Sequence, residues 1–342
     1  MLVYDAIAFS LQQAGGISVL FSELFARLPA GSFEVIGHRQ PPPSVIPQAS
    51  YRHQPPRLFE RFRRARVTKG CELFHTTYYR RPDNRDTKVV TTVYDYVYER
   101  LAPMHQRVAH TWQKRRTIDA SDRVICISEN TRRDLVEFMG PSVADRAVVI
   151  PLAASAEFRP IPGVTPLAQV LFVGRRVAYK RFLPVVSALS SIPDVQLILA
   201  GGGPLTKAEI EVLEAHLPRR YRATGHISNA ALNVEYNRSL CLAYPSSYEG
   251  FGIPIVEAMQ AGCPVIATAG SSINEVAGNA AILLERGDQD EIRLAVESVK
   301  ISATRNALIA KGRTQAAKFS WDATCRKTIA VYEQLTGKPL IR

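Results

Sequence analysis

The sequence predicts an α/β fold with two doubly wound parallel sheets, one in each of two domains. Candidate strands and helices alternate along the chain, the alternation restarts after residue 163, and a segment rich in proline and small residues separates the two series. With 342 residues, 46% hydrophobic and 22% charged, the chain can form two domains that each bury a core. Ligands of such sheets bind beyond the carboxyl ends of the strands, so we expect the site in a cleft between the domains.

The first series gives the N-terminal domain. Its candidate strands span 2–8, 33–37, 72–75, 88–94, 123–127 and 147–150, and its candidate helices span 17–28, 107–120 and 130–139. Residues 151–163 contain three prolines and indicate a linker. We therefore expect one domain over residues 1–152 and a second over 153–320.

The second series repeats the pattern. Its candidate strands span 169–173, 195–200, 221–224, 240–244, 264–268 and 280–284, and its candidate helices include 181–189 and 207–216. Between residues 240 and 268 the order is strand, glycine-containing loop, helix and strand, with Pro254 at a favourable first helical position and Gly262 as the stop. This βαβ unit places its loop at the carboxyl edge of a parallel sheet.

The loop of this unit is a candidate diphosphate site. Gly250 and Gly252 let backbone N–H groups approach an anion, and the positive end of the following helix adds to the attraction. Glu257 suits the vicinal hydroxyls of a ribose, and Glu249 suits those of a sugar. The spacing leaves a structural alternative open, in which Glu249 caps the helix and Glu257 is a solvated helical residue. Ser272, followed by Glu275, fits a capping box.

A net charge of +12 calls for an anionic partner. Basic residues from Arg57 to Lys69 cluster with Leu58, Phe59 and Phe62 and fit a short amphipathic helix at an anionic membrane surface. The alternative is a solvated helix that docks these three apolar side chains onto its own domain. No zinc-finger, RNA-recognition or P-loop signature is present, so we expect no nucleic-acid partner.

Cysteine usage and hydropathy indicate a cytoplasmic protein. The five cysteines lack a paired spacing, so we expect buried thiols and no structural metal. No apolar run approaches the about 20 residues of a membrane helix, and the N-terminus is unlike a signal peptide.

Several collinear segments resemble glycosyltransferase family four, the retaining enzymes of the GT-B fold. Residues 248–266 match its E-x7-E signature almost residue by residue, and residues 172–180 and 200–204 resemble its V-G-R…K segment and its G-x-G-P turn. Residues 5–18 resemble the glycine loop of the acceptor domain. Residues 74–79, 92–95 and 127–131 are similar to segments of bacterial polysaccharide-assembly members, including enzymes of lipopolysaccharide synthesis. Residues 319–322 and the helix that follows resemble the element that returns to the first domain, which assigns residues from about 321 to 342 to that domain.

The resemblance implies retaining transfer of a hexose, such as mannose, from a GDP- or UDP-linked sugar to a hydroxyl of a growing glycan. Arg175 and Lys180 would bind the diphosphate, so neither a metal nor another cofactor is implied. Glu257 would hold the ribose and Glu249 the donor sugar. Backbone groups complete the donor site, and Gly15 and Gly16 let the first domain close on the phosphates. The implied backbone positions are Gly174, Gly203, Gly250, Phe251, Gly252 and Ile253.

The chain departs from the family where many members have a histidine that contacts the donor sugar. Tyr94 stands there, just before Asp95, and a phenol can donate a hydrogen bond but cannot replace an imidazole. Asp95 is a candidate proton acceptor, and His75 is another cleft candidate. For all three, a strand-end residue held by local hydrogen bonds is the alternative.

Three functions follow from the resemblance. The first is a transferase that acts on a polyprenyl-diphosphate-linked acceptor, in the cytoplasm or peripherally on the inner membrane. The others are a GT-B epimerase or hydrolase, and a catalytically silent nucleotide-sugar binding module.

Overall fold

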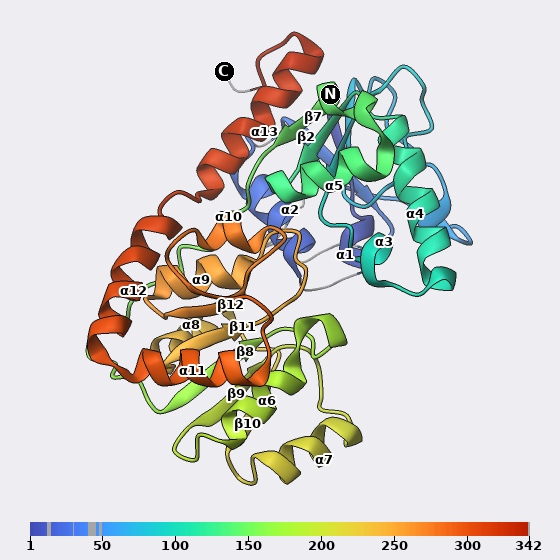
Figure 1. Cartoon of the computed structure of the whole chain (residues 1–342). Coiled ribbons are helices and arrows are strands. Elements are labelled where there is room, and N and C mark those ends of the chain that lie inside the picture. Colours follow the sequence, from blue (N-terminus) through green and yellow to red (C-terminus); the bar gives the residue numbers. More distant parts are fainter. Residues whose placement is uncertain (12–14, 30, 40–45, 48–49, 341–342) are drawn as a thin grey trace. The chain divides into compact units, whose positions relative to one another are not determined.

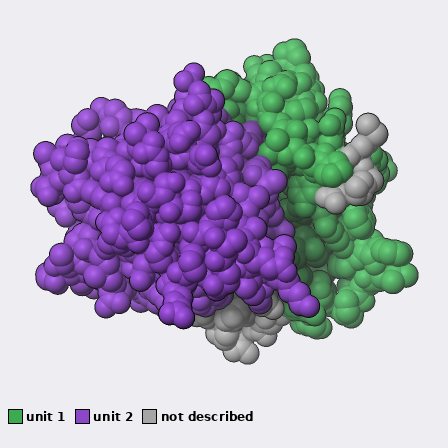
Figure 2. Space-filling model, turned by 60° about the horizontal axis from the view of Figure 1, so that its bottom comes forward, with its two compact units in different colours: residues 1–152, 321–342 green, residues 153–320 purple. Residues whose placement is uncertain are grey.

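The computed structural model describes residues 1–340 apart from 12–14, 30, 40–45 and 48–49. The chain forms two compact units, coloured separately in Figure 2. Unit 1 comprises Met1–Leu152 and Trp321–Arg342, and unit 2 comprises Ala153–Ser320. Each unit contains one parallel sheet with helices between its strands (Figure 1), which confirms the predicted fold class.

The sheet of unit 1 has seven parallel strands in the order β3-β2-β1-β4-β5-β6-β7. β1 pairs with β2 on one side and β4 on the other, so the strand order reverses there, and an open sheet binds ligands beyond such a reversal. The strands are β1 (Leu2–Asp5), β2 (Phe33–Gly37), β3 (Tyr51–His53), β4 (Leu73–Thr76), β5 (Lys88–Val93), β6 (Arg123–Cys126) and β7 (Ala147–Val149).

The helices of unit 1 follow these strands. Ser128 accepts a hydrogen bond from the backbone N–H of Thr131 and so caps α5. The described helices are α1 (Ile7–Leu11), α2 (Gly16–Arg27), α3 (Val97–Leu101), α4 (Met104–Asp119), α5 (Glu129–Met139) and α13 (Trp321–Thr336), with single 3-10 turns at Glu60–Phe62 and Pro141–Arg146.

The predicted amphipathic helix between Arg57 and Lys69 is wrong. Only the 3-10 turn Glu60–Phe62 forms, because Phe59 has a left-handed backbone (φ 57°) and the Arg57 guanidinium bonds both Glu60 and the carbonyl of Arg64. The alternative, in which the apolar side chains dock onto their own domain, is also wrong, since Leu58, Phe59 and Phe62 are 74%, 70% and 50% exposed.

Helix α13 is fastened to the core of unit 1 by aromatic and polar contacts. The Tyr332 hydroxyl lies 2.9 Å from the Tyr4 hydroxyl and 2.5 Å from Nδ1 of His75, whose Nε2 lies 2.9 Å from the Thr92 hydroxyl. Burial lowers the pKa of His75 to about 3, so its imidazole is neutral. His75 is fully enclosed, so local hydrogen bonding, the alternative for this residue, is what the structure shows.

The sheet of unit 2 has six parallel strands in the order β10-β9-β8-β11-β12-β13. The order reverses between β8 and β11, which are paired through Val170 and Cys241 and through Leu171 and Leu242. The strands are β8 (Gln169–Val173), β9 (Gln196–Ala200), β10 (Tyr221–Gly225), β11 (Cys241–Tyr244), β12 (Val265–Thr268) and β13 (Ile282–Leu284).

Two groups of helices bury this sheet. α6, α7 and α11 share one apolar core with alternate residues of β8 and β9, while α9 packs against β11, β12 and the helices α8 and α12. The helices are α6 (Phe182–Ser190), α7 (Lys207–His216), α8 (Asn229–Arg238), α9 (Ile253–Ala261), α10 (Ile273–Ala277), α11 (Gln289–Lys300) and α12 (Ser302–Ala316), and a 3-10 turn spans Ala178–Lys180.

All five cysteines are buried free thiols. Within the described ranges, no helix is both long enough and apolar enough to cross a membrane.

Candidate functional site

The candidate site of unit 2 forms where the strand order reverses. The loops that leave β8 and β11 carry Arg175 to Lys180 and Ser246 to Gly252, and both strands end at the same sheet edge. The backbone N–H of Ser247 donates to the carbonyl of Tyr179 (2.8 Å), so the two loops are joined directly. Two segments about 70 residues apart in sequence are thereby fixed beside each other.

Lys180 and Glu249 form an ion pair across these loops. The ammonium also lies 3.2 Å from the Tyr244 hydroxyl and 4.9 Å from the centre of its ring. Both side chains are only 13% exposed, so the pair holds a cation and a carboxylate in a partly dry place. An anion bound here would share the ammonium with Glu249.

Arg175 extends into solvent, while its neighbour Arg176 binds the protein. Among the described residues, no hydrogen bond or ion pair holds the Arg175 guanidinium, which leaves its five donors for a ligand. Arg176 donates to Oε1 of Glu209 (2.9 Å) and to the carbonyls of Gly203 (3.0 Å) and Pro204 (2.9 Å). The sequence analysis did not predict this supporting role of Arg176. The only indication in the sequence was that Arg176 directly follows Arg175.

The turn that Arg176 holds consists of three consecutive glycines in left-handed conformation, with φ angles of 74°, 75° and 79° for Gly201, Gly202 and Gly203. A Cβ on Gly202 would collide with the carbonyl oxygen of Gly174, so the turn lies directly against the β8 loop. The two predicted backbone positions Gly174 and Gly203 therefore belong to one small region.

Two serines, Ser271 and Ser272, form hydrogen bonds with the backbone of the loop that precedes α9. The Ser272 hydroxyl donates to the carbonyls of Glu249 (2.9 Å) and Phe251 (3.0 Å), and the backbone N–H of Glu249 donates to Ser271 (3.0 Å). The predicted capping box at Ser272 is wrong, because its backbone is already helical and its side chain serves this loop. Ser272 supports the loop through its carbonyls, which the sequence pattern did not indicate.

The ends of α9 follow the sequence signals. Gly252 precedes the helix with a left-handed backbone (φ 101°), Pro254 occupies its first turn after Ile253, and Gly262 ends it with φ 80°. Glu249 does not cap this helix, since its carboxylate pairs with Lys180. That part of the structural alternative is wrong.

Glu257 is not a solvated residue either. Its carboxylate accepts a hydrogen bond from the buried Tyr236 hydroxyl (2.9 Å), and burial raises its pKa to about 7, although that bond favours the charged form. Burial raises the pKa of the Tyr244 hydroxyl, and the negative charges of Glu249 and Glu257 add to this shift. Glu249 and Glu257 therefore both influence the same buried tyrosine, and each has its own partner, Lys180 for Glu249 and Tyr236 for Glu257.

The predicted residues of unit 1 lie at its own strand ends. Gly15 precedes α2 with an extended backbone, and the exposed Gly16 is its first residue. The hydroxyl of the buried Tyr94 donates to the carbonyl of Thr77 (2.8 Å). The Asp95 carboxylate accepts from the backbone N–H of Val97 (3.0 Å), and burial raises its pKa. The rest of the glycine loop, residues 12–14, lies outside the described residues.

Over the described ranges, no group of three or more histidine, cysteine or acidic side chains is arranged to hold a metal ion.

Two family models match the sequence. The model of group 1 glycosyl transferases matches residues 156–315, and that of glycosyltransferase family 4 matches residues 7–158. The chain belongs to this glycosyltransferase family. The candidate site in unit 2 lies within the group 1 match.

One relative of this glycosyltransferase is O-antigen chain mannosyltransferase B of Escherichia coli, 28% identical over 241 residues. The alignment covers 64% of this chain and 62% of that relative, so the chain spans less than two thirds of its length.

Solved structures share the fold. Sucrose-phosphate synthase from Thermosynechococcus elongatus superposes with a TM-score of 0.76 at 21% identity, covering 98% of this chain and 99% of that one. Anabaena HepE in complex with UDP-glucose gives 0.73 at 15% identity, covering 97% and 99%. The fold is GT-B.

Proposed function

We propose that the protein transfers a hexose, such as mannose, from a GDP- or UDP-linked sugar to a hydroxyl of a growing, lipid-linked glycan, in the cytoplasm. The observation that carries the proposal is the Lys180–Glu249 pair at the reversal point of the sheet in unit 2, on the loop that also carries the exposed Arg175. Cations so placed attract a diphosphate and offset the charge that it gains as the glycosidic bond breaks. The Escherichia coli mannosyltransferase and the UDP-glucose in HepE support the substrate classes.

The donor would lie along the loops in a defined direction. Arg175 and Lys180 bind its diphosphate, Glu257 accepts from the ribose hydroxyls, and Glu249 accepts from the sugar. Further contacts come from backbone groups at Gly174, Gly203, Gly250, Phe251, Gly252 and Ile253. The proposal requires neither a resident metal nor another cofactor, because the two cations would offset the charge of the leaving group.

Transfer would proceed with retention of configuration. The leaving diphosphate takes the proton of the acceptor hydroxyl as that hydroxyl attacks from the same face of the sugar, so no protein nucleophile is used. Unit 1 would supply the acceptor side, with Gly15 and Gly16 near the phosphates and with Tyr94 and Asp95 near the reacting hydroxyl. The Tyr94 hydroxyl already donates to Thr77, so its role would require it to exchange that bond.

A nucleotide panel tests this proposal. We expect one of GDP, UDP, ADP and dTDP to raise the melting temperature of the full chain as its concentration rises, because ligand that binds the folded state stabilises it by mass action. The products formed from the nucleotide sugar are then identified with and without a lipid-linked acceptor. Free sugar formed without acceptor would favour the hydrolase, a second nucleotide sugar formed without acceptor would favour the epimerase, and binding without any product would favour the silent module. No shift with any nucleotide would contradict the transferase and all of these alternatives.

Glu257 predicts a pH dependence of nucleotide binding. Its carboxylate accepts from both ribose hydroxyls, one on each oxygen, only when ionised, because protonation turns one oxygen into a donor. Its pKa is raised to about 7. Affinity for the nucleotide should therefore rise about tenfold between pH 6 and pH 8. The matched control is Glu257→Gln, which should bind more weakly and remove this part of the pH dependence, while titration of the nucleotide itself is common to both proteins. Parallel pH curves for the two proteins would contradict the ribose role.

The Glu257 carboxyl should also make the stability of the fold depend on pH, but stability should fall with rising pH whereas nucleotide affinity should rise. The folded state holds the Glu257 proton up to about pH 7, whereas the unfolded chain releases it near the model value of 4.5. The stability contributed by this proton is complete below about pH 4.5 and is lost as the pH rises through 7.

A further inference from the structure

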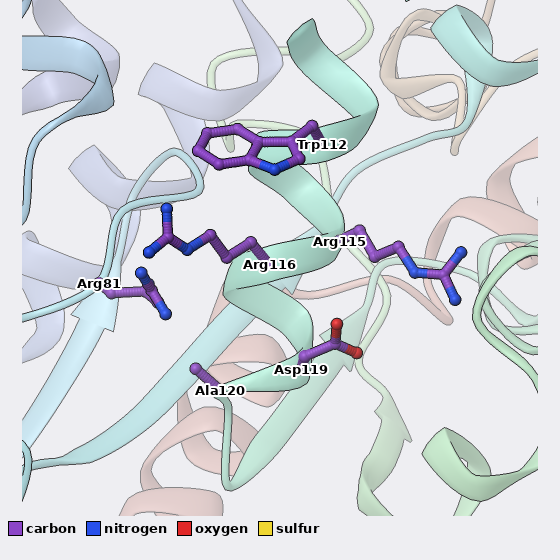
Figure 3. Close-up of a pocket in the computed structure, with 6 residues that line it drawn as sticks. All are labelled: Arg81, Trp112, Arg115, Arg116, Asp119 and Ala120. Carbon is purple, nitrogen blue, oxygen red and sulfur yellow. The ribbon is translucent and has the colours of Figure 1, made fainter. Parts of the chain in front are cut away.

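A basic pocket of about 470 Å³ opens on the surface of unit 1, where the last turns of α4 meet the chain at Arg81 (Figure 3). In Figure 3 the side chains of Arg81, Arg116 and Trp112 lie to one side of α4, while Arg115 and Asp119 lie to the other. The residues that line the pocket are Arg81, Trp112, Arg115, Arg116, Asp119 and Ala120.

The arginines of this pocket are not neutralised by the protein. Among the described ion pairs, none involves Arg81, Arg115 or Arg116. Partial burial lowers the pKa of Arg81, as do the positive charges of Arg116 and Arg64. The Arg116 guanidinium lies 5.0 Å from the centre of the Trp112 ring. Of the described residues that line the pocket, Asp119 alone is acidic, and it forms no ion pair with these arginines, so the pocket keeps an excess of positive charge that suits an anion with several oxygens, such as a phosphate.

Exposed apolar side chains lie on α4 and on the segment that is hydrogen-bonded to the elements of this pocket. The backbone N–H of Ala65 donates to the carbonyl of Arg81 (2.8 Å), and the Gln113 amide of α4 donates to the carbonyl of Arg61 (2.9 Å). These bonds join Arg61 and Ala65 to α4 and to the chain at Arg81, the two elements that form the pocket, and we take the exposed apolar side chains of α4 and of residues 57–66 as part of the same surface. Its exposed apolar members are Leu58, Phe59, Phe62, Val108 and Trp112.

The pocket is separate from the ligand edge of its own sheet. α4 ends at Asp119 and β6 begins at Arg123, so the last turn of α4 lies near the amino edge of the sheet. The proposed sugar and nucleotide contacts of unit 1 lie after β1 and β5, at the carboxyl edge. The basic residues at the end of α4 also suit its dipole, but that role does not explain Arg81 or the exposed Trp112.

We propose that this surface docks onto an anionic lipid bilayer, with the phosphate of a lipid headgroup in the pocket between Arg81 and Arg116. Paired guanidinium groups fit phosphate oxygens, Trp112 lies at the depth where aromatic rings favour the interface, and Leu58, Phe59 and Phe62 enter the acyl boundary. A nucleic acid would use the charges but would leave these three exposed side chains in water. The inference goes beyond the proposed transfer reaction and does not depend on unit 2.

Vesicle flotation of the full chain tests the proposal. We expect binding to vesicles of phosphatidylglycerol and phosphatidylcholine at low salt, weak binding to phosphatidylcholine alone, and release as the ionic strength rises. Arg81→Gln/Arg116→Gln should weaken binding about 30-fold, from about 1 kcal/mol for each charge at the surface. Trp112→Ala and Phe59→Ser should also weaken it, at unchanged charge.

The matched control is Arg326→Gln/Lys327→Gln, which removes the same charge from exposed positions on α13. This control should float like the wild type, and both double variants should keep the wild-type melting temperature and nucleotide-induced shift. An equal loss of vesicle binding in the two double variants would overturn the proposal that the pocket binds a lipid headgroup. So would binding of inorganic phosphate or glycerol phosphate without vesicle binding, or binding of an oligonucleotide as tight as that of the vesicles.

Discussion

Replacing Arg175 or Lys180 with alanine should lower kcat for sugar transfer by about 10²–10³-fold each, the loss typical when one donor to a developing charge is removed. Both residues lie where the β8 loop faces the Glu249 loop, and both would contact the diphosphate as it leaves. The measurement is turnover with the donor that the nucleotide panel identifies. Unchanged turnover in both variants would overturn the site assignment.

Arg175→Ala and Lys180→Ala should differ in their effect on the stability of the fold. Arg175 is exposed, so Arg175→Ala should leave the melting temperature unchanged, and Arg313→Ala, at another exposed arginine of unit 2, should change neither turnover nor melting. Lys180→Ala leaves the Glu249 carboxylate, 13% exposed, without its ammonium, and should lower the free energy of unfolding by about 1–3 kcal/mol. A loss of turnover in Arg175→Ala that merely followed a loss of folding would contradict a role in binding.

The sheets could be predicted because their strands are short apolar runs buried on both faces, as in 240–244 and 264–268. The order of strands could not, since it depends on which strand each crossover reaches. Three short elements of unit 1 were also missed, and the strand predicted over residues 2–8 ends at Asp5, before α1. β3 (Tyr51–His53), α1 (Ile7–Leu11) and α3 (Val97–Leu101) are three to five residues long, too short for a periodic pattern to develop.

In the candidate site, the sequence indicated residues whose motif is continuous and missed those whose partners are distant. Gly252, Pro254 and Gly262 act within their own helix, so local signals placed them correctly. Ser272 serves carbonyls more than 20 residues away, and Arg176 serves a turn 25 residues away. His75 failed as a cleft candidate for the same reason, because its partner Tyr332 lies on the last helix of the chain.

Lys114 provides the largest expected effect on folding. Its side chain is almost fully buried in α4, and its ammonium lies 3.3 Å from Oε2 of Glu99, 2.5 Å from the carbonyl of Asp95 and 3.2 Å from the centre of the Tyr96 ring. Burial lowers the pKa of this amine, while the negative charges of Glu99 and Asp95 oppose the change. The carboxylate of Glu99 is only 2% exposed, and Lys114 is its ammonium partner.

Lys114→Met should therefore lower the free energy of unfolding by about 3–5 kcal/mol, because it removes the ammonium that pairs with the buried Glu99 carboxylate and leaves the Thr111 hydroxyl (3.4 Å) and His110 (3.8 Å) beside it. Lys88→Met is the matched control, since Lys88 forms an exposed pair with Asp122, and it should cost less than about 1 kcal/mol. Adding Glu99→Gln to Lys114→Met should restore part of the loss, because the stranded charge is then absent. Denaturant unfolding measures all three. If Lys114→Met cost no more than Lys88→Met, the Glu99 charge would not depend on Lys114, and the loop at Asp95 would be held by other contacts.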